Sequence, residues 1–240
     1  MEKQEVKVFG QTRNNEEAHL YTIGNNRGMS AQISDFGATL VRLYVPDGSG
    51  KTIDVVHGYD DPSGYEKGDG GFGATVGRNA NRIGGAEFEI NGVTYQLDKN
   101  DNGNNLHSGM NYYHKRMWEV EEYEADHIRF HLLSPDGDQG YPGTLDVHVT
   151  YMLDEENTLN IHYEAVPDQD TIVNMTNHSY FNLNGHDSGT VLNHKVTLNA
   201  DSFTPADEKS IPTGEIRSVE GTPMDSRAGR VLGDDIDADY

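Results

Sequence analysis

The stretch Leu145–Leu153, which reads Leu-Asp-Val-His-Val-Thr-Tyr-Met-Leu, decides the fold class. Apolar residues occupy every second position, and Asp146 and His148 lie between them. Because successive side chains of a strand point to opposite faces of a sheet, this alternation predicts a β-strand with one buried face. A polar turn follows at residues 154–157, and the same alternation resumes over residues 159–165. The two segments therefore predict two consecutive strands.

Similar alternation recurs along the chain, over residues 88–90, 93–97, 128–132 and 192–198. The dipeptide Asn91-Gly92 between the first two of these segments predicts a tight hairpin, since both turn residues must take positive φ. No long segment has helical periodicity, and 27 glycines mark frequent turns. The pattern predicts an all-β sandwich or barrel. No repeat or linker interrupts it, so we expect one domain over residues 1–240.

The composition narrows the range of partners. The 240 residues contain 18 Lys and Arg against 40 Asp and Glu, a net charge of −22. Such acidity disfavours nucleic acid and anionic membranes as partners, although solubility alone also explains it. The chain has no cysteine, which excludes disulfides and thiol chemistry. The first residues lack the apolar core of a signal peptide, and no apolar run is long enough to span a membrane, so we expect a cytoplasmic protein. The sequence does not indicate an oligomeric state.

Two loop motifs resemble cofactor or metal sites, and both have simpler explanations. Gly68–Gly73 fits the dinucleotide spacing G-x-G-x-x-G, but the residues that follow it do not open a helix. Asp98–Gly103 begins like a calcium loop, but the twelfth position, which needs a glutamate, is Gly109. We therefore expect turns at both places and no cofactor.

The eleven histidines also raise the question of a metal site. His127 and His131 would share one face of a strand, but Arg129 would lie between them. A cation beside the pair argues against a metal ion there. No His-Glu-x-x-His or similar motif is present either, so the sequence predicts no metal site.

Four polar residues, at three places in the chain, remain as candidates for binding or catalysis. Asn81 and Arg82 together offer donors and an acceptor, a mixture that suits sugar hydroxyls, although these residues alone favour a structural ion pair between Arg82 and a carboxylate. His107 follows an Asn-Asn-Leu segment in a predicted loop, where binding groups concentrate. His178 can exchange a proton near neutral pH, but it could equally be a core histidine with satisfied hydrogen bonds.

Ten segments along nearly the whole chain carry recognisable motifs. They are Asp35–Leu40, Val45–Asp47, Gly73–Arg78, Asn81–Ile83, Asn105–Gly109, Ser134–Gly137, Gly140–Gly143, Thr176–Leu183, Pro212–Glu215 and Gly221–Asp225. In this order they resemble the aldose 1-epimerase (galactose mutarotase) family, with serine in place of the first glycine of the family's Leu-His-Gly-Gly motif, at Ser108. The resemblance implies a large antiparallel β-sandwich of the galactose mutarotase type.

The resemblance also implies roles for the candidate residues. His178 matches the family's catalytic acid, which protonates the ring oxygen of a hexose. His107 matches a histidine that contacts the same part of the sugar, and Asn81 and Arg82 match residues that hold hydroxyls. The implied reaction interconverts the α and β anomers of free galactose or glucose through ring opening. It needs no cofactor or metal, because its chemistry is proton transfer.

The sequence departs from the family pattern near its end. Family members continue through a Gly-Tyr-Asp-His segment and a glutamate that acts as the base, and neither occurs before Tyr240. We therefore expect a sandwich that is incomplete at its C-terminus, and an acid without its partner base. Glu215 and Glu220 lie in a different motif. The alternative functions are a carbohydrate-binding protein without catalysis and a purely structural β-sandwich.

Overall fold

The computed structural model describes residues 4–68 and 70–238. The chain divides into two compact units, Met1–Phe181 and Asn182–Tyr240. The single domain expected over residues 1–240 stays a prediction, since a compact unit is not by itself an independently folding domain. In the described part of the chain, no helix combines the length and the apolar character needed to cross a bilayer.

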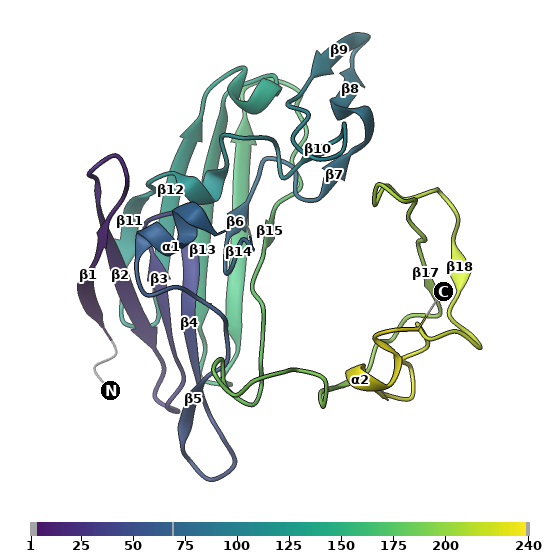
Figure 1. Ribbon diagram of the computed structural model, residues 1–240. Helices are drawn as coiled ribbons and strands as arrows, with labels where there is room; N and C mark the ends of the chain where they lie inside the picture. The colour runs from purple at the N-terminus through teal and green to yellow at the C-terminus, as the bar shows by residue number, and fades with distance from the viewer. Residues whose placement is uncertain (1–3, 69, 239–240) are drawn as a thin grey trace. The chain divides into compact units, whose positions relative to one another are not determined.

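Two antiparallel sheets dominate the first unit (Figure 1). Strands follow one another along the chain in both sheets, so each connection joins two neighbouring strands. The first sheet contains β1 (Glu5–Gln11), β2 (Glu17–Gly24), β3 (Ser30–Ser34), β4 (Thr39–Pro46) and β5 (Thr52–Asp54). The second contains β11 (Glu119–Tyr123), β12 (His127–Ser134), β13 (Leu145–Leu153) and β14 (Leu159–Pro167).

The apolar faces of the two sheets form one core. The alternate residues of β13 from Leu145 to Leu153 are all at most 2% exposed, whereas Asp146 and His148 on the other face are half-buried. The β13 residues belong to the same hydrophobic cluster as Ile33 of β3. The all-β sandwich and the strand at 145–153 are confirmed. The packing follows from the period-two pattern, because burying one face of each sheet removes apolar surface from water.

Short strand pairs extend from the sandwich. The hairpin of β8 (Glu87–Ile90) and β9 (Val93–Gln96) confirms the predicted turn, with φ of 54° at Asn91 and 77° at Gly92. Two further pairs join segments far apart in the chain. They are β6 (Thr75–Val76) with β15 (Thr176–Asn177), and β7 (Arg82–Ile83) with β10 (Asn105–Leu106).

The helices are short, as the sequence predicted. The first unit contains α1 (Pro62–Lys67) and the 3₁₀ turns η1 (Gly84–Ala86), η2 (Tyr113–Lys115) and η3 (Asp138–Gly140). Asp61 caps α1, since its side chain accepts a hydrogen bond from the Gly64 amide.

The second unit contains only short elements among its described residues. They are β16 (Lys195–Val196) paired with β19 (Arg230–Val231), β17 (Ser202–Phe203) paired with β18 (Arg217–Ser218), and α2 (Leu232–Asp235). The strand predicted over residues 192–198 was wrong in extent, because only Lys195 and Val196 pair. Leu192 is 43% exposed and Leu198 is 51% exposed, so the alternation there creates no buried face that would extend the strand.

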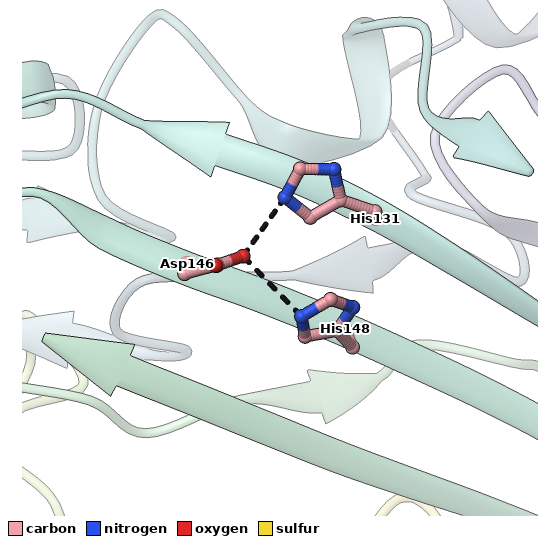
Figure 2. A group of neighbouring side chains, drawn as sticks. All are labelled: His131, Asp146 and His148. Carbon is pink, nitrogen blue, oxygen red and sulfur yellow. Dashed lines mark hydrogen bonds and ion pairs between the residues drawn. The ribbon is translucent and has the colours of Figure 1, made fainter. Parts of the chain in front are cut away.

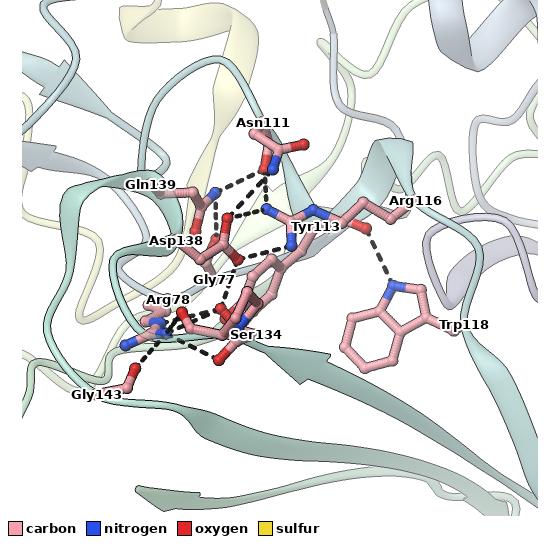
Figure 3. Close-up of polar contacts among 11 residues, drawn as sticks. Gly77, Arg78, Asn111, Tyr113, Arg116, Trp118, Ser134, Asp138, Gln139 and Gly143 are labelled. Atoms are coloured by element: carbon pink, nitrogen blue, oxygen red, sulfur yellow. Dashed lines mark hydrogen bonds and ion pairs between the residues drawn. The ribbon is translucent and has the colours of Figure 1, made fainter. Parts of the chain in front are cut away.

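One fully buried arginine ties the loops at one end of the sandwich together (Figure 3). The guanidinium of Arg78 donates to the carbonyls of Ser134 (3.1 Å), Pro142 (2.9 Å) and Gly143 (2.7 Å). It also donates to the hydroxyl of Ser134, which in turn donates to Asp138 (2.5 Å). The planar fork of five donors suits this arrangement of fixed oxygens.

A second arginine extends the same network. Arg116 forms a bidentate ion pair with Asp138, with distances of 2.7 and 2.8 Å. Trp118 Nε1 donates to the carbonyl of Tyr113 (3.0 Å), which fixes the chain on either side of Arg116. The network therefore joins the segment after β6, the segment around η2 and the loop that carries η3 (Figure 3).

Replacing Arg78 with methionine tests how much this network contributes to the stability of the fold. The change leaves several buried carbonyls without donors, so we expect the free energy of unfolding to fall by about 3–5 kcal/mol. Urea denaturation measures the loss. Arg13→Met is the control, since the Arg13 side chain is 64% exposed and should cost less than about 1 kcal/mol. Equal losses in the two variants would contradict the structural role of Arg78.

Candidate functional site

A cavity of about 810 Å³ opens in the first unit. Its size lies in the range typical of small-molecule sites. Residues from four parts of the chain line it: 68 with 70–71, and members of the segments 76–82, 106–115 and 174–180. The structure brings Asn81, Arg82, His107 and His178 together in this one lining. The four sequence-predicted residues thus share a concave surface, although 97 positions (178 − 81) separate the first from the last.

The backbone around His178 is held from both sides. The strand pair β6–β15 ends at His178, whose amide donates to the Ala74 carbonyl (2.9 Å) and whose carbonyl accepts from the Gly73 amide (3.2 Å). Gly73 has φ of 61°, and a Cβ there would lie 1.9 Å from the Leu40 carbonyl oxygen. Only glycine allows this close approach. The tight turn at Gly73 therefore helps to fix the position of the His178 backbone beside the cavity.

The neighbour of His178 strengthens this placement. Asn177 Nδ2 donates to the Gly73 carbonyl (3.1 Å) and to the hydroxyl of the buried Tyr151 (3.2 Å). Tyr151 lies on the inner face of β13, so the core of the sandwich supports the segment directly. The His178 ring itself is half-buried and lines the cavity.

His107 is held by a reciprocal pair of bonds with Asn81. The Asn81 amide donates to His107 Nδ1 (3.0 Å), and the His107 amide donates to the Asn81 carbonyl (3.0 Å). An N–H that donates to Nδ1 needs a lone pair there, so this imidazole is neutral and carries its proton on Nε2. His107 therefore presents a hydrogen-bond donor.

Burial keeps His107 neutral. Removal from water, and after it the neighbouring His178 and Arg82, lowers the pKa of His107 to about 4. The two imidazoles lie edge to face, with ring centroids 5.3 Å apart and an interplanar angle of 88°. The Tyr180 ring also packs against His178, with ring centroids 5.2 Å apart. The arrangement gives two imidazoles different environments within one cavity.

Arg82 is both structural and part of the cavity. Its Nε donates to Asp101 (2.7 Å), which fixes the plane of the guanidinium, and its Nη1 donates to Asn81 Oδ1 (3.3 Å). The sequence left the choice between an ion pair and a binding role open, and the geometry combines the two. The predicted turn at Asp98–Gly103 therefore has a structural role, because it supplies Asp101, the partner of Arg82.

Sequence reasoning missed three cavity residues, Tyr112, His114 and Lys115. His114 stacks on Tyr112 with ring centroids 4.8 Å apart. Burial, and after it the charge of Lys115, lowers the pKa of His114 to about 3. The run of aromatic and basic residues at 112–115 was the available signal, but no periodicity distinguishes such a run from an ordinary loop.

The glycine-rich segment Gly68–Gly73 also belongs to this site. Gly68, Gly70 and Gly71 line the cavity, while Asp69 lies outside the described residues. The short strand β6 follows the segment, as expected when the dinucleotide interpretation was set aside. The glycines bring backbone rather than side chains to the cavity wall, which leaves room for a ligand beside His178.

Comparisons relate this chain to known proteins. The sequence profile of the family described as aldose 1-epimerase matches residues 19–240. The galactose mutarotase of Bos taurus is 44% identical over 205 residues, which cover 85% of this chain and 59% of that protein. The aldose 1-epimerase of Escherichia coli (strain K12) is 38% identical over 220 residues, which cover 92% of this chain and 63% of that protein. The chain thus spans about three fifths of the length of these curated relatives.

Solved structures show the same fold. The GalM/aldose epimerase homologue from C. elegans superposes with a TM-score of 0.85 and 36% identity, covering 90% of this chain and 66% of that chain. The galactose 1-epimerase from Lactobacillus acidophilus NCFM superposes with a TM-score of 0.86 and 30% identity, covering all of this chain and 70% of that chain. The galactose mutarotase-like sandwich expected from the sequence is confirmed.

The tautomer of His107 can be tested by nitrogen NMR. We expect Nδ1 to carry no proton and Nε2 to be protonated, with a titration midpoint near pH 4. The folded pKa lies below the unfolded value of about 6.5, so the unfolded chain binds more protons between these values. The stabilising contribution of neutral His107 is therefore complete above about pH 6.5 and is lost as the pH falls toward 4. In the His107→Gln variant, the free energy of unfolding should fall less steeply than in the wild type as the pH decreases from about 6.5 to 4. A protonated Nδ1 at pH 7 would contradict the assignment.

Proposed function

Because the chain belongs to the aldose 1-epimerase family, we propose that it acts on the anomers of a free hexose, galactose or glucose. The observation that carries the proposal is the convergence of His178, His107, Asn81 and Arg82 on one cavity. A hexose presents a ring oxygen and several hydroxyls, and this lining offers imidazole, amide and guanidinium groups to match them.

His178 is the proton donor of the proposed reaction. In the described part of the chain, neither of its ring nitrogens has a hydrogen-bond partner, so both can meet a ligand. Protonating the ring oxygen weakens its bond to the anomeric carbon. When the proton of the anomeric hydroxyl is removed, that bond breaks and the open-chain aldehyde forms. Rotation about the adjacent bond and reclosure give the other anomer.

His107 has a different task, although it is also an imidazole. Its Nδ1 is engaged by the Asn81 amide, so only the Nε2–H faces a ligand. Being neutral, it donates a hydrogen bond to the sugar without competing as an acid, and it does not repel a protonated His178. The two adjacent histidines can therefore have different roles: His178 donates a proton, and His107 donates only a hydrogen bond.

Asn81 and Arg82 would hold hydroxyls of the sugar. Arg82 keeps donors of its guanidinium for a ligand after its Nε bond to Asp101. Asn81 adds an amide donor at the same end of the cavity. Among the described residues that line the cavity none is a carboxylate, and these residues supply the proton-donating half of the reaction.

The remaining sequence-based expectations stay predictions. They are a cytoplasmic location, no nucleic-acid or membrane partner, and no cofactor or metal in the reaction. The acidic net charge of −22 supports the absence of a nucleic-acid partner.

Replacing His178 with glutamine tests the catalytic assignment. Glutamine keeps hydrogen-bonding capacity but cannot donate a proton as an acid, so acceleration of mutarotation should fall by about 10²–10⁴. Polarimetry on freshly dissolved α-galactose measures the rate against buffer. His162→Gln is the control, since His162 is exposed on β14, away from the cavity, and should leave the rate unchanged.

Two results would count against this proposal. If the His178→Gln variant keeps the wild-type rate, His178 is not the acid. If the wild-type chain binds galactose by calorimetry but does not accelerate mutarotation, a carbohydrate-binding role without catalysis replaces the enzymatic one.

Asp101→Asn tests whether Asp101 positions Arg82. Asparagine keeps the size but loses the charge-assisted bond, so Arg82 should hold the sugar less firmly and KM should rise about 3- to 10-fold with little change in kcat. Glu89→Gln on the exposed side of β8 is the matched control for loss of one negative charge. An unchanged KM with reduced stability would show that Asp101 only supports the fold.

A further inference from the structure

A second group of chemically active side chains lies on the outer face of the second sheet (Figure 2). His131 of β12 pairs directly with His148 of β13, and Asp146 precedes His148 by two residues on the same face. Their alternation partners point the other way, into the core between the sheets. None of these three residues lines the sugar cavity.

The three side chains point toward one spot. Both imidazoles approach a single oxygen of Asp146, at 2.8 Å from His131 Nε2 and 3.3 Å from His148 Nε2. The three potential ligand atoms all lie within 4.8 Å of one another. Ligand atoms about 2.1 Å from a tetrahedral ion lie about 3.4 Å apart, so shifts of about 1 Å would complete such a geometry. The stacked rings, with centroids 5.0 Å apart, set the two nitrogens side by side.

Carboxylates stand behind both imidazoles. Glu121 Oε2 lies 2.9 Å from His148 Nδ1, and Glu119 Oε2 lies 3.6 Å from His131 Nδ1. A carboxylate at Nδ1 favours a proton on that nitrogen and leaves the lone pair of Nε2 free to bind a metal. Metal-binding histidines commonly have this outer partner, which fixes the ring and raises its basicity.

The charge of Arg129, which counted against a metal in the sequence analysis, is balanced by neighbours. Arg129 donates to Glu121 (3.0 Å) on the adjacent strand β11 and to Glu164 on β14, the strand beyond β13. His127, the partner then considered for His131, instead contacts Asp126 Oδ1 at 2.8 Å. Four carboxylates therefore contact Arg129, His131 or His148, and their negative charge exceeds that of the one arginine, so the local field favours a cation. These are Glu119, Glu121, Asp146 and Glu164.

We propose that His131, Asp146 and His148 bind one divalent transition-metal ion of the zinc class. Two imidazoles and a carboxylate form a ligand set that suits Zn²⁺, whereas Mg²⁺ and Ca²⁺ prefer oxygen alone. A water molecule completes the coordination. Because the ligands come from two strands, the ion would cross-link β12 and β13 and stabilise the folded chain in proportion to its occupancy.

Calorimetric titration of the whole chain with ZnCl₂ tests the site. The wild type should bind one Zn²⁺ at the site, and His131→Gln and His148→Gln should each weaken that binding by about tenfold or more. The melting temperature should rise with Zn²⁺ in the wild type and much less in these variants. MgCl₂ should produce neither effect.

Two matched controls separate this site from other histidines. His127→Gln removes an imidazole with carboxylate partners from the same face of β12, and His178→Gln removes one from the cavity. Both should keep the wild-type affinity for Zn²⁺. Melting temperatures without metal verify that all variants fold. Absence of Zn²⁺ binding to the wild type, or binding that survives both His131→Gln and His148→Gln, would overturn the proposal and leave a hydrogen-bonded network only.

Discussion

The buried guanidinium of Arg78 is the constraint on which the rest of the site depends. A charged group that is fully buried must meet oxygen atoms in every donor direction, or the cost of removing it from water is not offset. Arg78 meets this requirement with carbonyls from the end of β12 and the loop before β13. The position of its own backbone is thereby fixed relative to the sandwich.

Backbone hydrogen bonds of Arg78 and its neighbour Asn79 fix the segments that carry the two histidines of the cavity. The Arg78 carbonyl accepts from the Asn174 amide (2.8 Å), which lies four residues before His178. On the other side, Ser108 Oγ accepts from the Asn79 amide (2.7 Å) and donates to the Asn79 carbonyl (3.1 Å), next to His107. One segment therefore locates two imidazoles from distant parts of the chain. The hydroxyl of Ser108, at a position where the family motif has glycine, contributes directly to this link.

The sequence predicted what depends on local periodicity and missed what depends on register. The strand at 145–153 and the Asn91-Gly92 hairpin follow from patterns a few residues long, so they could be predicted. The pairing of β6 with β15 joins two-residue strands a hundred positions apart, and no local pattern encodes it. The same applies to the facing of His131 and His148, which depends on the register of two strands. The candidate residues of the cavity were identified through family motifs, and their bonding geometry was not predictable.

Two residues that line the cavity, and Ser108 beside one of them, have unfavourable backbone conformations. Asn81, His107 and Ser108 all have positive φ, at 61°, 53° and 71°. Each such non-glycine residue costs of order 1 kcal/mol or more, so the surrounding bonds must hold it. The reciprocal bonds between Asn81 and His107 do so, and they leave Nε2–H as the free donor of the His107 ring. His131 and His148 on the outer face of the second sheet have no such conformational cost, because they lie on regular strands. The polar residues of the cavity thus lie on loops with unfavourable backbone conformations that a buried arginine network holds in place. The group of His131, Asp146 and His148 depends only on the register of two regular strands.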